Sequence, residues 1–108
     1  MATAAALLLS EGKGEKVVVL TVKEMTLIAD YFVIASGSNQ RHARALADRV
    51  LEGIQDTRKP SHVEGYEVGY WVLLDYGDVV VHVFRETERA FYNLERLWGD
   101  APRLEWEQ

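Results

Sequence analysis

The chain has 108 residues, of which 48% are hydrophobic and 27% charged, and this size and composition indicate one globular domain over residues 1–108. The absence of cysteine excludes disulfides, a zinc site with thiolate ligands and a thiol nucleophile. The net charge of −5 arises wholly in residues 55–108, which hold eleven acidic and six basic residues, so the charge disfavours direct nucleic-acid binding and favours a basic protein partner.

The first third of the chain predicts one helix followed by two strands. Residues 2–11 are rich in Ala and Leu, which favour a helix that ends near Gly12 and Gly14. This apolar stretch has no basic flank and is too short to span a membrane, so we expect a cytoplasmic protein with no membrane partner. The β-branched runs 16–22 and 31–36 predict the first two strands, whereas residues 23–30 are not assigned.

Residues 37–55 predict a capped amphipathic helix. Ser38 or Asn39 is expected to cap the N-terminus of a helix over residues 40–55. Apolar residues recur at helical spacing along it, namely Ala43, Leu46, Ala47, Val50 and Ile54. We expect this stripe to face the core and the polar residues 56–61 to form a loop.

The central stretch, residues 70–84, predicts an antiparallel hairpin of runs 70–74 and 79–84, with Gly77 at a positive φ in the turn. If Tyr76 and Gly77 form a two-residue loop, Trp71 lies opposite His82. Side chains alternate, so one face is expected to carry Trp71, Leu73, Asp75, Asp78, Val80, His82 and Phe84. The other face is wholly apolar and carries Val72, Leu74, Val79, Val81 and Val83. We expect the apolar face to be core and the mixed face to carry function.

After the hairpin, Thr87 is expected to cap one last helix over residues 88–98, and Gly99 and Pro102 to end it. Its predicted apolar face consists of Ala90, Phe91, Leu94, Leu97 and Trp98. The order of helices and strands predicts a single α/β domain, a β-sheet flanked by helices.

The polar residues do not form a recognisable catalytic or metal site. His42, His62 and His82 are twenty residues apart and lack the spacing of a metal motif, and Asp75 and Asp78 are explained by turn chemistry. The Ser36–Gly37–Ser38–Asn39 turn lacks the glycine pattern of a nucleotide-binding loop. We therefore expect no metal and no other cofactor.

Several stretches together resemble the ribosomal silencing factor family, also called Iojap-like. They are residues 71–84 (Trp-Val-Leu-Leu-Asp-Tyr-Gly-Asp-Val-Val-Val-His-Val-Phe), residues 30–38 (Asp-Tyr-Phe-Val-Ile-Ala-Ser-Gly-Ser), Arg41-His42, Glu64-Gly65, and Glu88, Tyr92, Leu94, Glu95, Leu97 and Trp98. They occur in the family's order and spacing and cover nearly the whole chain after the first helix.

The resemblance implies a mixed β-sheet flanked by helices, a fold related to the nucleotidyltransferases, and a role in bacterial translation. Family members bind the fourteenth protein of the large ribosomal subunit, block association with the small subunit and lower translation when nutrients are scarce. Relatives in organelles act in ribosome assembly. For this chain the resemblance implies a non-enzymatic factor whose partner is the large ribosomal subunit.

The family's hairpin signature is matched by Trp71, Asp75, Tyr76 and Asp78, which we expect to face the partner, and Tyr92 and Glu95 of the helix signature are expected to join them. The alternatives are a nucleotidyltransferase-like enzyme that uses the Gly37-Ser38 turn, and a large-subunit assembly factor. The enzyme would need a close acidic pair after that turn, and Asp75 and Asp78 have the wrong spacing. A homodimer of the free protein stays open.

Overall fold

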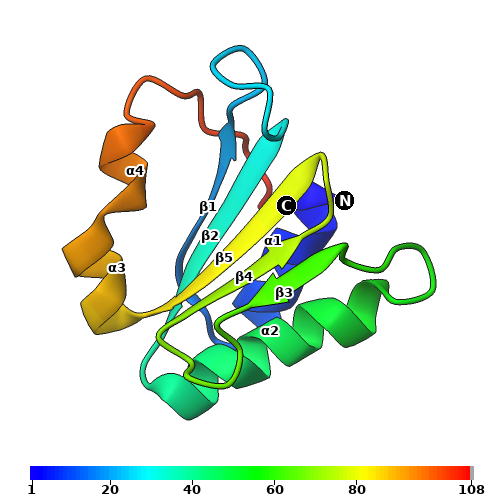
Figure 1. Ribbon diagram of the computed structural model, residues 1–108, viewed down its shortest axis with the longest axis vertical. Coiled ribbons are helices and arrows are strands. Elements are labelled where there is room, and N and C mark those ends of the chain that lie inside the picture. The colour runs from blue at the N-terminus through cyan, green and yellow to red at the C-terminus, as the bar shows by residue number, and fades with distance from the viewer. Residues whose placement is uncertain (108) are drawn as a thin grey trace.

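A five-stranded mixed sheet, with the strand order β1-β2-β5-β4-β3, forms the centre of the molecule in the computed structural model, which describes residues 1–107 (Figure 1). The elements are α1 (Ala2–Glu11), β1 (Glu15–Thr21), β2 (Tyr31–Gly37), α2 (Gln40–Ile54), β3 (His62–Glu64), β4 (Trp71–Asp75), β5 (Val79–Arg85), α3 (Glu86–Tyr92) and α4 (Leu94–Leu97). Strands β2 and β5 are parallel, and the other neighbouring pairs are antiparallel. This architecture confirms the predicted α/β class.

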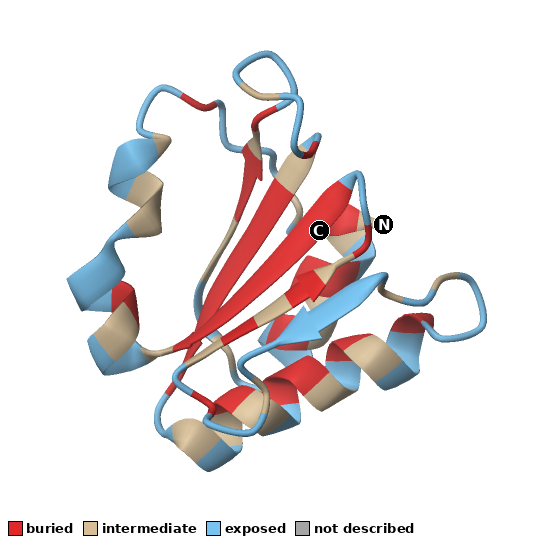
Figure 2. Ribbon diagram, viewed as in Figure 1, coloured by how far each residue is buried: buried red, intermediate tan, exposed pale blue. Residues whose placement is uncertain are grey.

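The two faces of the sheet have separate cores. Helices α1 and α2 cover one face, where the alternating side chains Val72, Leu74, Val81 and Val83 are completely buried. The other face packs under α3, α4 and the C-terminal segment around Phe32, Ile34, Val80 and Phe84. Figure 2 shows that burial is concentrated in the central strands, whereas β3 at one edge is exposed.

The second helix forms as the sequence pattern predicts. Asn39 is its N-cap, and the side-chain Oδ1 accepts a hydrogen bond of 2.8 Å from the backbone N–H of His42. The five residues of the predicted stripe are all buried against the sheet. Capping and periodicity therefore act together to fix this helix on one face.

The β4–β5 hairpin forms, but the predicted register is wrong by two residues. Trp71 lies opposite Phe84, and Leu73 lies opposite His82. The two-residue loop is Gly77-Asp78, because Tyr76 donates its backbone N–H to the Val79 carbonyl at 2.9 Å and Gly77 adopts a φ of +92°. A shift of two residues keeps each side chain on its face, so the predicted division into two faces survives.

The expectation of one continuous last helix is also wrong. Asn93 has a left-handed φ of +45°, which ends α3 and separates it from α4. The predicted apolar stripe is divided: Leu94 and Trp98 pack against the sheet, whereas Phe91 is 79% and Leu97 is 75% exposed. Arg89, which the periodicity places outside the stripe, is instead buried.

The C-terminal segment runs along the outer edge of β1. Thr21 donates its backbone N–H to the Pro102 carbonyl at 2.8 Å, and Leu104 donates to the Val19 carbonyl at the same distance. Trp106 adds a hydrogen bond of 3.2 Å from its indole Nε1 to the Val17 carbonyl. This segment occupies backbone groups that an edge strand otherwise leaves free.

Candidate partner-binding site

Trp71, at the start of β4, lies in a cluster of aromatic rings on the sheet face that packs against α3 and α4. Its half-buried indole stacks on Phe84 with a centroid distance of 4.8 Å and contacts Tyr92 at 4.9 Å. The Tyr92 side chain comes from α3 and is 48% exposed. Half-buried aromatic side chains held by their neighbours are well suited to anchor a protein interface. We call Trp71 and Tyr92 the aromatic pair.

His82 contacts Trp71 of the aromatic pair. The Trp71 indole Nε1–H donates a hydrogen bond of 3.1 Å to His82 Nδ1. His82 is buried, and this burial lowers the pKa of its imidazole from 6.5 to about 4, so the ring is neutral near pH 7. Since Nδ1 accepts, the proton of the neutral ring resides on Nε2, which has no hydrogen-bond partner among the described residues.

The acidic residues of the hairpin take part in local contacts. Asp78 forms an ion pair of 2.6 Å with Arg58, and the hydrogen bond from that guanidinium lowers the pKa of the carboxyl group. The Asp78 side chain is nevertheless 50% exposed. Asp75 is half-buried and accepts a hydrogen bond of 2.8 Å from the Gly77 backbone N–H. Asp75 thus shapes the turn, whereas Asp78 pairs with Arg58 and also reaches solvent.

The expectation that Tyr76 faces a partner is corrected by its burial. Its side chain is 5% exposed and belongs to the core under α1 and α2, where it follows Val72 and Leu74 along the same face of the strand. Burial raises the pKa of its phenol, and the hydroxyl has no hydrogen-bond partner among the described residues. Tyr76 therefore supports the hairpin from inside.

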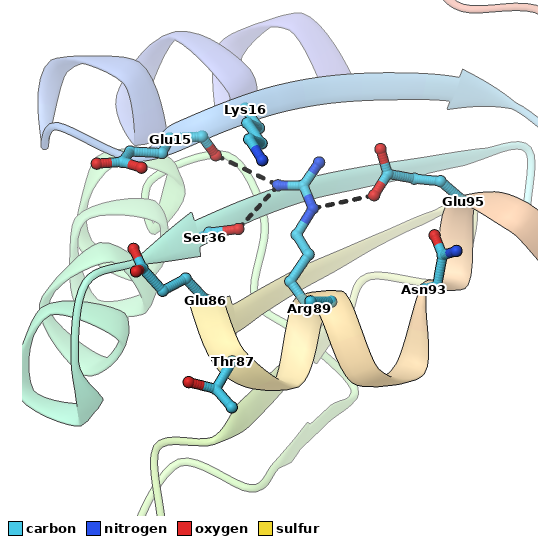
Figure 3. A pocket seen from close by; sticks show the side chains of 9 residues that line it. Glu15, Lys16, Ser36, Glu86, Thr87, Arg89, Asn93 and Glu95 are labelled. Atoms are coloured by element: carbon cyan, nitrogen blue, oxygen red, sulfur yellow. Dashed lines mark hydrogen bonds and ion pairs between the residues drawn. The ribbon is translucent and has the colours of Figure 1, made fainter.

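Glu95 lines a cavity of about 480 Å³, where its carboxylate points toward Arg89 (Figure 3). It accepts a hydrogen bond of 3.0 Å from Arg89 Nε and lies 3.7 Å from Arg103 Nη2. Arg89 Nη1 also donates to the Glu15 carbonyl at 3.2 Å and to Ser36 Oγ at 3.1 Å. The Arg89 charge is thus compensated within the fold, and Glu95 holds α3 and α4 against the sheet.

The turn after β2 has its polar groups engaged by the second helix. Ser38 donates its backbone N–H to His42 Nδ1 at 3.0 Å, and His42 Nε2 lies 2.9 Å from the Gly12 carbonyl. A side chain at Gly37 would meet the Ala43 backbone nitrogen at 2.7 Å, so glycine is needed for close packing. Within residues 1–107, no group of three or more His, Asp and Glu side chains is placed to hold a metal ion.

The structure joins Trp71 and Tyr92 but separates the other predicted site residues. Asp75 is four residues along β4 from Trp71, a distance of about 13 Å at the usual rise of a strand. Residue types alone did not identify His82 as a contributor, although its alternation with Phe84 placed it on the correct face.

No helix among the described residues is long and apolar enough to cross a membrane.

The mixed sheet, its two helical layers and the half-buried aromatic pair define a small α/β domain with a candidate protein-binding surface. The chain belongs to the family described as "Ribosomal silencing factor during starvation", whose model matches residues 1–108. A Halalkalibacterium halodurans protein named Ribosomal silencing factor RsfS is 49% identical over 96 residues, which are 88% of this chain and 82% of that protein.

Two further similarities extend this assignment. A crystal structure of a Chromobacterium violaceum protein has a TM-score of 0.86 at 35% identity, covering 89% of this chain and 81% of that one. The mouse protein named Mitochondrial assembly of ribosomal large subunit protein 1 is 30% identical over 95 residues, which are 84% of this chain and 42% of the mouse protein.

Proposed function

We propose that this protein is a ribosomal silencing factor that binds the large subunit through its fourteenth protein and sterically blocks association with the small subunit. The outcome would be lower translation under nutrient limitation, in the cytoplasm where the ribosomes reside. The proposal rests on family membership and, in this chain, on the aromatic pair. No bond is made or broken in this mechanism.

The aromatic pair supports the proposal because it combines exposure with rigidity. Trp71 is stacked on the buried Phe84 and covered on one side by Tyr92, so its ring has few alternative positions. Aromatic side chains that bind in a fixed orientation lose little entropy and commonly contribute the largest share of interface energy.

The charge around the hairpin supports a basic partner. Residues 61–84 include four acids, Glu64, Glu67, Asp75 and Asp78, and no lysine or arginine. Asp78 is partly neutralised by Arg58, whereas Glu64 and Glu67 are exposed. Carboxylates on β3, β4 and the turn after β4 would steer a positively charged ribosomal protein toward this part of the sheet and favour one orientation.

Co-sedimentation with isolated large subunits, small subunits and whole ribosomes tests the proposal directly. We expect binding to free large subunits alone, and light scattering should show slower joining of the two subunits. Tyr92→Ala should weaken large-subunit binding by about thirtyfold, the effect of losing an interface anchor of about 2 kcal/mol. Leu27→Ala, at a fully exposed position in the β1–β2 connection, is the control and should bind like the wild type.

A charge-reversal pair tests the electrostatic part. Asp75→Lys combined with Asp78→Lys should weaken binding more at low salt than at high salt, because screening reduces the repulsion. Glu24→Lys combined with Glu105→Lys changes the net charge equally at two exposed positions and serves as the control. Equal effects of the two pairs would show that overall charge, and not the position of Asp75 and Asp78, governs binding.

Two rival functions predict different results. A nucleotidyltransferase-like enzyme would bind nucleotide with magnesium saturably in calorimetry and lose that binding in Ser38→Ala. A large-subunit assembly factor, which the name of the mouse relative favours, would associate with immature large subunits, and its depletion would reduce the number of mature ones. Preference for mature free large subunits, without nucleotide binding, would favour the silencing factor.

A further inference from the structure

His82 is a polar residue at a position that is surrounded by the apolar core of this sheet face. It is 5% exposed, and its nearest rings include Phe32, in an edge-on contact of 5.0 Å, and Phe84. One of its two nitrogens is buried without a partner among the described residues. A buried polar atom without a partner destabilises a fold, so packing gives no reason for histidine here.

The hydrogen bond from Trp71 gives such a reason. We propose that His82 is a positioning residue: by accepting the Trp71 indole Nε1–H at 3.1 Å, it fixes the orientation of that ring at the partner-binding surface. This role rests on the proposed function, since it concerns the same aromatic pair.

The geometry around Trp71 shows why a hydrogen bond is needed. The indole stacks on Phe84 at an interplanar angle of 30° and is tilted by 47° relative to the Tyr92 ring. Ring-to-ring contacts tolerate a range of offsets and tilts, so they leave the indole small changes of orientation. A directional hydrogen bond at the ring edge removes this freedom. A pre-oriented ring pays less entropy on binding, an advantage of about two- to tenfold in affinity for one side chain.

A matched pair of variants separates positioning from packing. His82→Asn places an amide oxygen near the position of Nδ1 and keeps an acceptor, whereas His82→Leu has nearly the same size and no acceptor. We expect His82→Asn to bind large subunits as the wild type does and His82→Leu to bind about two- to tenfold more weakly. Stability should follow the opposite order, because leucine suits the apolar surroundings better than asparagine.

The chemical shift of the Trp71 indole N–H in ¹⁵N-resolved NMR gives an independent readout. We expect a hydrogen-bonded shift, with slow exchange, in the wild type and His82→Asn, and loss of both in His82→Leu. Should His82→Leu fail to fold, His82→Met, whose flexible side chain fills irregular gaps, takes its place.

The two outcomes that would overturn the inference are distinguishable from failure of the proposed function. Full affinity of folded His82→Leu, or equal losses in both variants, would overturn positioning alone. Absence of large-subunit binding by the wild type would overturn the proposed function and this role together, even if the indole shift follows the expected order.

Discussion

Acidification should destabilise this protein in part through His82. The imidazole has a pKa of about 4 in the folded protein because burial disfavours its charged form, against an ordinary value of 6.5 in an unfolded chain. Between these two values the unfolded chain binds a proton that the folded one does not. The free energy of unfolding therefore falls as the pH drops from about 6.5 toward 4, and above pH 6.5 the imidazole makes no such contribution.

The magnitude follows from the same two values. Each pH unit in which only the unfolded chain is protonated costs about 1.4 kcal/mol, so the full loss approaches about 3 kcal/mol at pH 4. At pH 5 it is about 2 kcal/mol. For a domain of ordinary stability, between about 5 and 15 kcal/mol, this is a substantial fraction.

Urea unfolding of the wild type and of His82→Leu, measured from about pH 7.5 to about pH 4.5, isolates this contribution. The carboxyl groups titrate alike in both proteins and cancel in the difference between them. The stability of the wild type relative to His82→Leu should decline steadily below pH 6.5. A difference that does not change with pH would show that the folded protein protonates His82 readily, and would refute its burial as a neutral ring.

Three substitutions test other parts of the fold by the same unfolding measurement. Tyr76→Phe removes a buried hydroxyl that has no partner among the described residues and should leave stability unchanged or raise it by up to about 1 kcal/mol; a loss would reveal a hydrogen bond. Asn93→Ala should cost about 1 kcal/mol because of the left-handed backbone, and Asn93→Gly should cost less; equal losses would point to the side chain. Arg89→Met should cost about 2 kcal/mol by removing the charged donor of half-buried Glu95, and adding Glu95→Gln should restore part of it; no restoration would contradict the ion-pair account.

Local patterns predicted the elements whose signals lie within a few residues. The second helix has a cap and a continuous stripe, and both signals are confined to residues 39–54. The two faces of the hairpin were predicted despite the wrong register, because an error of two residues matches the period of a strand. The same alternation places Tyr76 with Leu74 on the core face, and assigning it to the loop concealed this.

Features that depend on distant residues were not predictable in this way. Arg89 is buried because acceptors from β1, β2 and α4 meet its guanidinium, and none of these is within five residues of it in the chain. The contact between Trp71 and Tyr92 joins residues that are brought together only by the return of α3 over the sheet. Helical periodicity also gave no sign of the left-handed residue Asn93, whose conformation redirects α4.

The C-terminal segment along β1 makes the two margins of the sheet unequal. Pro102 and Leu104 satisfy the backbone of β1, whereas β3, with only three residues, forms the opposite margin. A protein truncated after Ala101 would leave the valine-rich strand β1 as an unpaired edge, which favours aggregation through strand pairing between molecules. A purification tag at the C-terminus should therefore be attached through a flexible linker, so that it does not disturb the hydrogen bonds between the C-terminal segment and β1.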